Sequence, residues 1–118
     1  MTVLRRGDTY LVEFDPTRSH EIQKTRPAVI IQNDIGNRHS PVTIVAAITS
    51  ILSPTPYPVE VIIAPTHGNG LSTTSAIQLS QIRSVDKRRL VKRLGVVDPA
   101  TMRKVDEALT ISLGLVEL

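Results

Sequence analysis

The pattern of apolar and polar residues predicts a series of short strands followed by one helix. The expected strands are four- to eight-residue segments rich in β-branched residues or alternating apolar with polar positions. They cover residues 9–14, about 27–33, 43–48, 59–64, 75–79 and 81–85. Pro27 is expected at the first position of its strand, because proline has no N–H to donate to a neighbouring strand.

The last part of the chain predicts a helix. Asp98 is a typical N-cap residue, and Pro99 suits the first helical position. Apolar residues then recur at steps of three and four, as on one helix face. They are Met102, Val105, Leu109, Leu113 and Val116. Several strands followed by one helix favour a mainly β (α+β) fold, a small curled sheet or barrel closed by that helix. Any part of the apolar stripe that the sheet leaves uncovered is a candidate dimer surface.

The connecting segments divide into turns and longer loops. Residues 33–37 and 67–70 read as turns, and the proline-rich segment Ser53–Pro58 reads as an exposed loop. Residues 17–25 are polar and without period, which predicts a loop longer than a usual hairpin connection. Long ordered loops in small domains tend to carry function.

Composition narrows the class of protein. The 118 residues are 41% hydrophobic and 21% charged, as expected for one soluble globular domain spanning 1–118. The absence of cysteine excludes disulfides and thiolate chemistry and fits a cytoplasmic protein. No segment approaches the roughly 20 apolar residues that span a membrane. The net charge of +3 favours an anionic partner such as nucleic acid.

Two residues next to predicted strands are the first candidates for chemistry. Arg26 precedes Pro27 at the mouth of a strand, where a fixed guanidinium can hold a phosphate or carboxylate. The alternative is a surface arginine paired with a carboxylate. Thr49 follows the strand at 43–48, and its alternative role is to cap that strand end. The pattern alone does not bring Arg26 and Thr49 together.

Other polar residues are weaker candidates for a functional role. Ser19, His20 and Glu21 lie in the loop before Arg26, and Glu21 could equally be a solvated loop residue. The three histidines lack metal-ligand spacing, so no metal site is expected. The basic cluster at 87–93 could follow a phosphate backbone, or it could be the solvated face of a short helix.

Five segments in order resemble the MazF/PemK family of toxins from bacterial toxin–antitoxin systems. They are Arg6–Tyr10, Lys24–Asn33, Ile44–Thr49, Gln81–Leu90 and Val105–Leu109. The resemblance covers nearly the whole chain. It implies an SH3-like barrel with a C-terminal helix that works as a homodimer and is neutralised by a cognate antitoxin.

The resemblance also implies an activity and its residues. Members of the family are metal-independent endoribonucleases, without a cofactor, that cut single-stranded RNA within a short sequence. Their catalytic arginine and threonine correspond to Arg26 and Thr49, and an acidic residue important in some members corresponds to Glu21. Ser19, His20 and Gln81 are then expected to contact RNA. The same fold family includes toxins that poison DNA gyrase, the alternative function; those toxins do not need the Arg26 and Thr49 pair.

Overall fold

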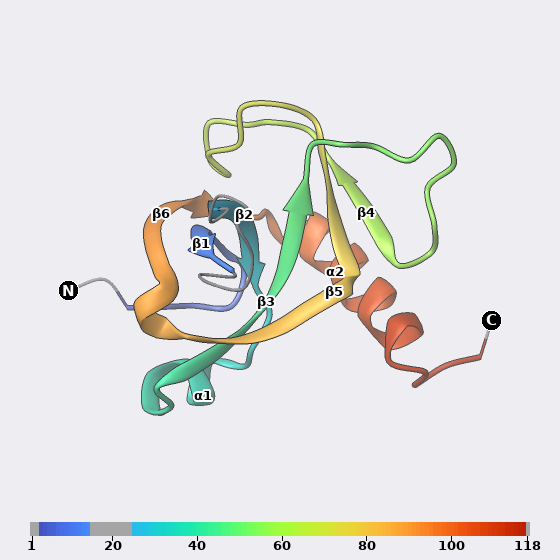
Figure 1. Cartoon of the computed structure of the whole chain (residues 1–118). Coiled ribbons are helices and arrows are strands. Elements are labelled where there is room, and N and C mark those ends of the chain that lie inside the picture. Colours follow the sequence, from blue (N-terminus) through green and yellow to red (C-terminus); the bar gives the residue numbers. More distant parts are fainter. Residues whose placement is uncertain (1–2, 15–24, 118) are drawn as a thin grey trace, which may run out of the picture.

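The computed structural model describes residues 3–14 and 25–117, which form one antiparallel sheet of six strands and two α-helices (Figure 1). The C-terminal helix packs across β4 and β5. The elements are β1 (Asp8–Glu13), β2 (Thr25–Ile30), α1 (Asp34–His39), β3 (Val42–Thr49), β4 (Glu60–Ile63), β5 (Ser75–Asp86), the single 3-10 turn η1 (Lys87–Arg89), β6 (Leu90–Val96) and α2 (Pro99–Ser112). The predicted mainly β architecture with a C-terminal helix is confirmed.

The sheet curls, and no strand pairing that closes it into a barrel is detected in residues 3–14 and 25–117. Its strand order is β4-β5-β3-β2-β1-β6, so β4 and β6 are the two edges, and no pairing joins them in the described part of the chain. The loop after β4 reaches the other edge instead, where the Val96 N–H donates to the Gly68 carbonyl at 2.8 Å. Figure 1 shows this loop beside the end of β6.

Two strand predictions need correction. The second strand begins at Thr25, so Pro27 is its third residue and not its first. Proline is tolerated there because pairing with β3 begins only at Ala28, which leaves β1 as the single paired neighbour of Pro27. The segments at 75–79 and 81–85 form one strand, β5, whose pairing with β3 shifts register between Ala46 and Ala47.

Two further segments differ in type from the prediction. Residues 34–37 belong to the short helix α1, and the Asn33 side chain caps this helix by accepting the Gly36 N–H at 2.8 Å. The basic segment 87–93 is a 3-10 turn leading into β6, not a helix. Pairing of β6 with β1 overrides the helical spacing of Leu90 and Leu94.

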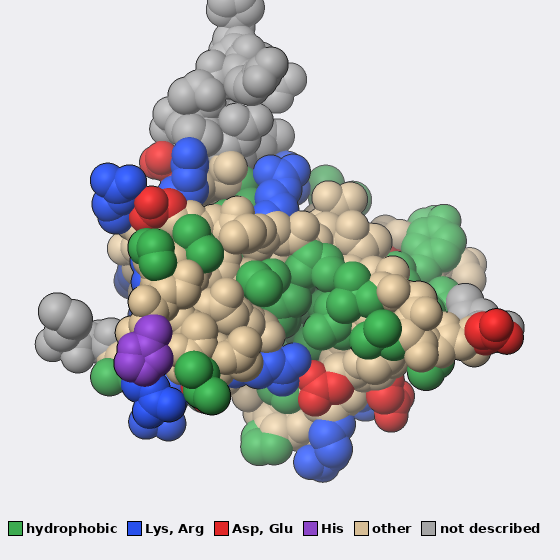
Figure 2. All heavy atoms as spheres, turned by 90° about the horizontal axis from the view of Figure 1, so that it is seen from below, with side chains coloured by type: hydrophobic (Ala, Val, Ile, Leu, Met, Phe, Trp, Pro, Cys, Tyr) green, Lys and Arg blue, Asp and Glu red, His purple; other side chains and the backbone are tan. Residues whose placement is uncertain are grey.

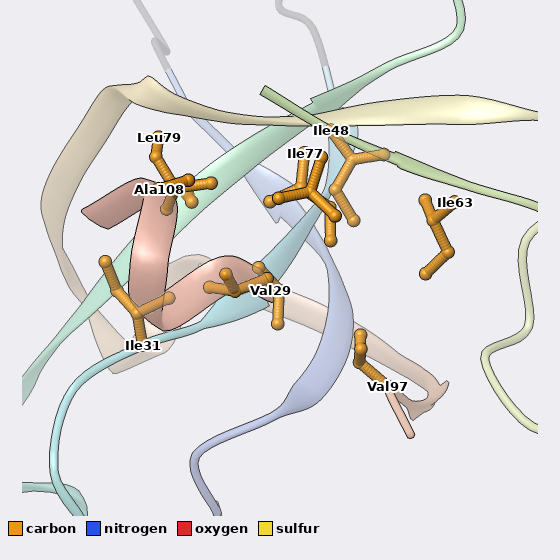
Figure 3. Packing of buried hydrophobic residues seen from close by; sticks show 11 residues of the cluster. Val29, Ile31, Ile48, Ile63, Ile77, Leu79, Val97 and Ala108 are labelled. Atoms are coloured by element: carbon orange, nitrogen blue, oxygen red, sulfur yellow. The ribbon is translucent and has the colours of Figure 1, made fainter. Parts of the chain in front are cut away.

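Strand alternation builds a separate core on each side of the sheet. The helix-side core lies under α2 (Figure 3) and includes Val29, Ala46, Ile48, Ile77, Leu79, Val105 and Ala108. The far-side core is formed by Tyr10, Val12, Ala28, Ile30, Val45 and Val85. Neighbouring residues such as Val45 and Ala46 enter opposite cores, as the two-residue period of a strand requires.

The helix α2 begins as predicted and ends at Ser112, before the last two residues of the predicted apolar stripe. The Asp98 carboxylate accepts the Thr101 N–H at 3.0 Å, and Pro99 occupies the first turn. Val105 and Ala108 are buried, whereas Leu113 and Val116, beyond the helix, are exposed. No helix among the described residues is long and apolar enough to cross a membrane.

Candidate functional site

The register of β2 and β3 brings the two leading candidates together. Ala28 pairs with Ala47, and the antiparallel ladder runs on through Val29 and Ile30. Extending the same register by two residues places Arg26 directly opposite Thr49. Residues opposite one another in an antiparallel pair point to the same face of the sheet. Arg26 and Thr49 therefore emerge together on the far side, at the end where its core stops.

Both residues line one open pocket. Its volume is about 460 Å³. The floor comes from the ends of β2 and β3, and a wall comes from the loop after β4. The lining residues are Leu11, Arg26, Pro27, Ile48, Thr49, Ser50, Ile51, Gly70, Leu71, Ser72, Thr73, Ser75 and Leu94. The wall residues Leu71, Ser72 and Thr73 were missed by the sequence analysis, since they form no motif and lie far from Arg26 along the chain.

The loop that makes this wall is tightly anchored to β6. Gly70 has φ +70°, and a Cβ at Gly70 would lie 2.2 Å from the Leu94 carbonyl oxygen. A Cβ at Gly95 would lie 2.1 Å from the Gly68 carbonyl oxygen. Glycine is therefore required on both sides of this contact, because any larger residue would separate the two backbones.

Asn69 fixes the same loop with polar contacts. Its side-chain amide donates to the Ala64 carbonyl at 3.0 Å and accepts the N–H of Thr66, also at 3.0 Å. The Thr9 hydroxyl donates to the Asn69 carbonyl at 2.9 Å. Asn69 is 3% exposed, and its bonds are buried or partly buried, so the wall of the pocket is preorganised.

The Thr49 side chain has a hydrogen bond that orients it. Its Oγ1 accepts the N–H of Ile51 at 3.1 Å, which confirms the strand-capping interpretation. A hydroxyl has one proton to donate and two acceptor sites. Because the backbone N–H uses only an acceptor site, and no acceptor for the Thr49 proton is found within residues 3–14 and 25–117, this proton can be donated to a ligand in the pocket.

The Arg26 guanidinium is exposed at the pocket. No carboxylate within residues 3–14 and 25–117 forms an ion pair with it. Ser19, His20 and Glu21 lie outside the described residues. Gln81 is exposed in β5, in the irregular stretch between Gln78 and Ile82, and is not among the residues that line the pocket.

Most of the basic cluster at 87–93 is engaged within the protein. Arg88 forms a two-bond contact with the Asp86 carboxylate at 3.1 and 3.0 Å, and this contact lowers the pKa of Asp86 to about 2. Lys87 donates to the Asn37 carbonyl. Arg93 pairs with the buried Asp8 at 3.3 Å, and Arg89 donates to the Glu13 carbonyl at 3.3 Å. These contacts indicate that the cluster mainly holds β6 and α1 in place.

A second, apolar groove lies between the sheet and the end of α2. Its volume is about 300 Å³. It is lined by Ile31, Ile44, Ile82, Arg83, Ser84, Leu109 and Leu113. Figure 2 shows hydrophobic side chains gathered in a hollow on the face seen from below, with charged side chains around it. Leu113 is 56% exposed beside this groove.

No three His, Asp or Glu side chains in the described part of the chain come close enough to hold a metal ion. The pocket instead offers a guanidinium and hydroxyl groups, from Arg26, Thr49, Ser50, Ser72 and Thr73. Such a set of donors suits an anionic oxygen, because every one of them can donate a hydrogen bond.

Comparison with known proteins shows a family match over most of the chain. Residues 5–113 match the family described as the PemK-like, MazF-like toxin of type II toxin–antitoxin systems. The chain is 44% identical over 115 residues to the Endoribonuclease EndoA of Bacillus subtilis (strain 168), covering 98% of each chain.

Solved structures share the fold over nearly the full length. A mycobacterial endoribonuclease in complex with its cognate antitoxin matches with a TM-score of 0.80 and 27% identity, over 98% of this chain and 99% of the other. A MazE–MazF structure from Deinococcus radiodurans matches with a TM-score of 0.79 and 25% identity, over 98% and 100%.

Proposed function

This chain belongs to the PemK-like, MazF-like toxin family and is an endoribonuclease, and we propose that it cuts single-stranded RNA without a metal ion. The ribose 2′-oxygen bonds to the adjacent phosphorus as the bond to the 5′-oxygen breaks. The products are a 2′,3′-cyclic phosphate and a 5′-hydroxyl. The observation that carries this proposal is the shared pocket of Arg26 and Thr49.

Arg26 is proposed to bind the phosphoryl oxygens of the scissile bond. Negative charge grows on these oxygens in the transition state, so fixed donors aimed at them contribute most to the rate. The guanidinium fork can donate two charge-assisted hydrogen bonds to one phosphate. Its position beside Pro27, on a strand paired with β1, limits its movement. Arg26 is also the candidate for protonating the leaving 5′-oxygen.

Thr49 is proposed as the second donor to the same phosphate. Its hydroxyl is held by the Ile51 N–H, which leaves its proton free to point into the pocket. A threonine hydroxyl does not ionise near neutral pH, so its role is donation and not nucleophilic attack. Removing one such donor typically lowers the rate by about 10²–10³.

The base that removes the 2′-hydroxyl proton is assigned to Glu21, with His20 as the alternative. Both precede Arg26 closely in the chain, Glu21 by five residues. A carboxylate or a neutral imidazole can accept this proton, whereas Arg26 and Thr49 cannot. We assign RNA contacts to Ser19, His20 and Gln81.

We also propose two protein partners. A mycobacterial relative was solved with its cognate antitoxin, and a cognate antitoxin is expected to neutralise this chain in the same way.

The second partner is another copy of this chain. Leu113 lines the apolar groove at the end of α2 and is more than half exposed, so in a twofold dimer the end of α2 from each copy can pack against the groove of the other. Leu113→Asp should then reduce the mass in solution to that of a monomer, while Ile35→Asp, on the exposed face of α1, should leave the mass unchanged.

The test of the activity uses a long single-stranded RNA in excess EDTA, with the purified protein free of antitoxin. We expect discrete cuts ending in cyclic phosphate, and a loss of at least about 10²-fold in Arg26→Ala. Arg38→Ala, at an exposed site on α1, is the matched control and should cut like the wild type. Intact RNA after incubation with the folded wild-type protein would overturn the proposal and direct attention to DNA gyrase.

A further inference from the structure

A second exposed arginine lies on the same side of the sheet as the Arg26 pocket. Arg83 of β5 has its Cζ atom 5.7 Å from the ring centroid of Phe14, which directly follows β1. A guanidinium placed over an aromatic face is attracted by the ring and is restricted in its motion. The two residues are 69 positions apart in the sequence, so only the folded sheet brings them together.

Strand register shows that Arg83 and Thr49 share one face. Val45 pairs with Arg83, and Ala47 pairs with Gln78 across the register shift. Val45, Ala47 and Thr49 alternate along β3 and therefore point to the far side. Thr49 lies four residues from Val45, which is about 13 Å along a strand. The path from Thr49 to Arg83 also passes Gln78, a polar residue on the same face.

Within residues 3–14 and 25–117, Arg83 differs from most other cations of this region because no ion pair or hydrogen bond to an acceptor is found for its guanidinium. Arg88 and Arg93 are paired with Asp86 and Asp8. Lys87 and Arg89 donate to backbone carbonyls. No carboxylate in the described residues pairs with Arg83, so its N–H donors remain available while its flat face rests on Phe14. That geometry is suited to a phosphate, which a guanidinium binds edge-on.

We propose that Arg83, held by Phe14, binds a phosphate of the RNA other than the one that is cut, and thereby positions the strand over Arg26 and Thr49. This inference rests on the proposed ribonuclease function. The separation from Thr49 means that the two sites contact different nucleotides of one strand. Arg83 is thus a positioning residue that acts through binding, and the bond-breaking step does not require it.

Binding measurements test this role. The probe is an RNA containing the cleavage sequence found in the EDTA experiment, with a 2′-deoxyribose at the cut site so that it cannot react. Arg83→Gln should bind about tenfold more weakly than the wild type, and the slope of log affinity against log salt should decrease by about 0.7. The cleavage rate at saturating RNA should remain near that of the wild type. Arg103→Gln, at an exposed site on α2, is the matched control.

A second measurement identifies the phosphate. Neutral methylphosphonate linkages are introduced one at a time into the same RNA. One linkage away from the cut site should weaken binding by the wild type but not by Arg83→Gln. Phe14→Leu keeps the apolar contact and removes the ring, and it should weaken binding less than Arg83→Gln does.

Two results would overturn the inference. Unchanged affinity and salt slope in Arg83→Gln, with only a lower melting temperature, would make the Arg83–Phe14 contact purely structural. A lower rate at saturating RNA with unchanged affinity would instead place Arg83 in the chemical step. A wild-type protein that neither binds nor cuts RNA would refute the proposed function itself, a result distinct from both.

Discussion

The two sides of the sheet use the same strands for different purposes. On the helix side, apolar residues continue to the end of β3, and α2 covers them with Val105 and Ala108. On the far side, the core stops at Ala28, which pairs with Ala47, and the next far-side pair in the same register is Arg26 and Thr49. Polar groups at the open end of a rigid core are held in place without being buried. Because side chains alternate along each strand, one face of the sheet contributes mainly to stability, and the end of the other face carries the residues proposed for catalysis.

The largest expected effect of a substitution on the helix side is on stability. Leu79 is fully buried in the helix-side core. Leu79→Ala should reduce the free energy of unfolding by about 2–5 kcal/mol, because it removes buried surface and leaves a cavity. Chemical denaturation measures this change. The cleavage rate per folded molecule should stay close to that of the wild type.

The control for Leu79→Ala is Ile35→Ala, at a side chain that is 68% exposed on α1. Its unfolding free energy should change by no more than about 0.5 kcal/mol. If Leu79→Ala lowered the cleavage rate as strongly as Arg26→Ala while most molecules were folded, the separation between the two sides would not hold.

Gly95→Ala should affect both properties, since Gly95 lies where the pocket wall meets β6. The new methyl group would overlap the Gly68 carbonyl oxygen and displace the loop that carries Ser72 and Thr73. We expect a cleavage rate lowered by roughly tenfold and a reduced melting temperature, in keeping with the sensitivity of catalysis to small displacements. Rate and melting temperature are measured on the same preparation.

Gly68→Ala provides the matched control within the same loop. The nearest atom to a Cβ at Gly68 is the Thr66 Oγ1 at 3.8 Å, so an alanine fits without displacement. Gly68→Ala should therefore resemble the wild type. Equal losses in both variants would show that the loop responds to any substitution and that the contact with β6 has no special role.

The smallest expected effect concerns α1 and depends on pH. Asp34 accepts the Arg6 N–H at 2.7 Å, and this bond, with a second one from Asn37, lowers the pKa of Asp34 below its ordinary value of 3.8. A lowered pKa in the folded state stabilises the protein above pH 3.8, and this stabilisation is lost as the pH falls through the folded-state pKa. Asp34→Asn should thus melt slightly below the wild type at neutral pH.

Melting curves from pH 7 to pH 2 check this prediction for Asp34. The difference between Asp34→Asn and the wild type should shrink as the pH falls below about 4, because the wild-type carboxyl is then protonated. A difference that stays constant over the whole range would mean that the charge of Asp34 does not contribute.

The sequence predicted the positions of strands and helices better than it predicted which strands pair with one another. Strands at Thr9–Phe14 and Thr43–Ile48 and the Asp98 cap of α2 follow from local patterns, and the structure confirms them within a residue or two. Strand β6 was missed because five of the seven residues at 87–93 are basic and read as a solvated face, while pairing with β1 decides the conformation of this segment. The local conformational preference of these residues does not include the energy of pairing with a strand that is distant in the sequence.

The candidate site was predicted in its parts and not in its assembly. Arg26 and Thr49 were identified individually, but their proximity depends on the pairing of β2 with β3, which no motif encodes. The wall formed by Leu71–Thr73 depends on the close contact between Gly70 and Leu94. The pairing of Arg83 with Phe14 likewise joins distant segments, so it became visible only in the folded chain.

The most direct test of the account is a double-mutant cycle on the single-turnover cleavage rate, with Arg26→Ala, Thr49→Val and the variant that carries both substitutions. Because both residues are proposed to stabilise one phosphate, the loss in the double variant should be much smaller than the product of the two single losses. Thr49→Val keeps the shape of the side chain and removes its proton donor. A double loss equal to the product of the single losses would show that Arg26 and Thr49 act independently, and it would contradict the shared site.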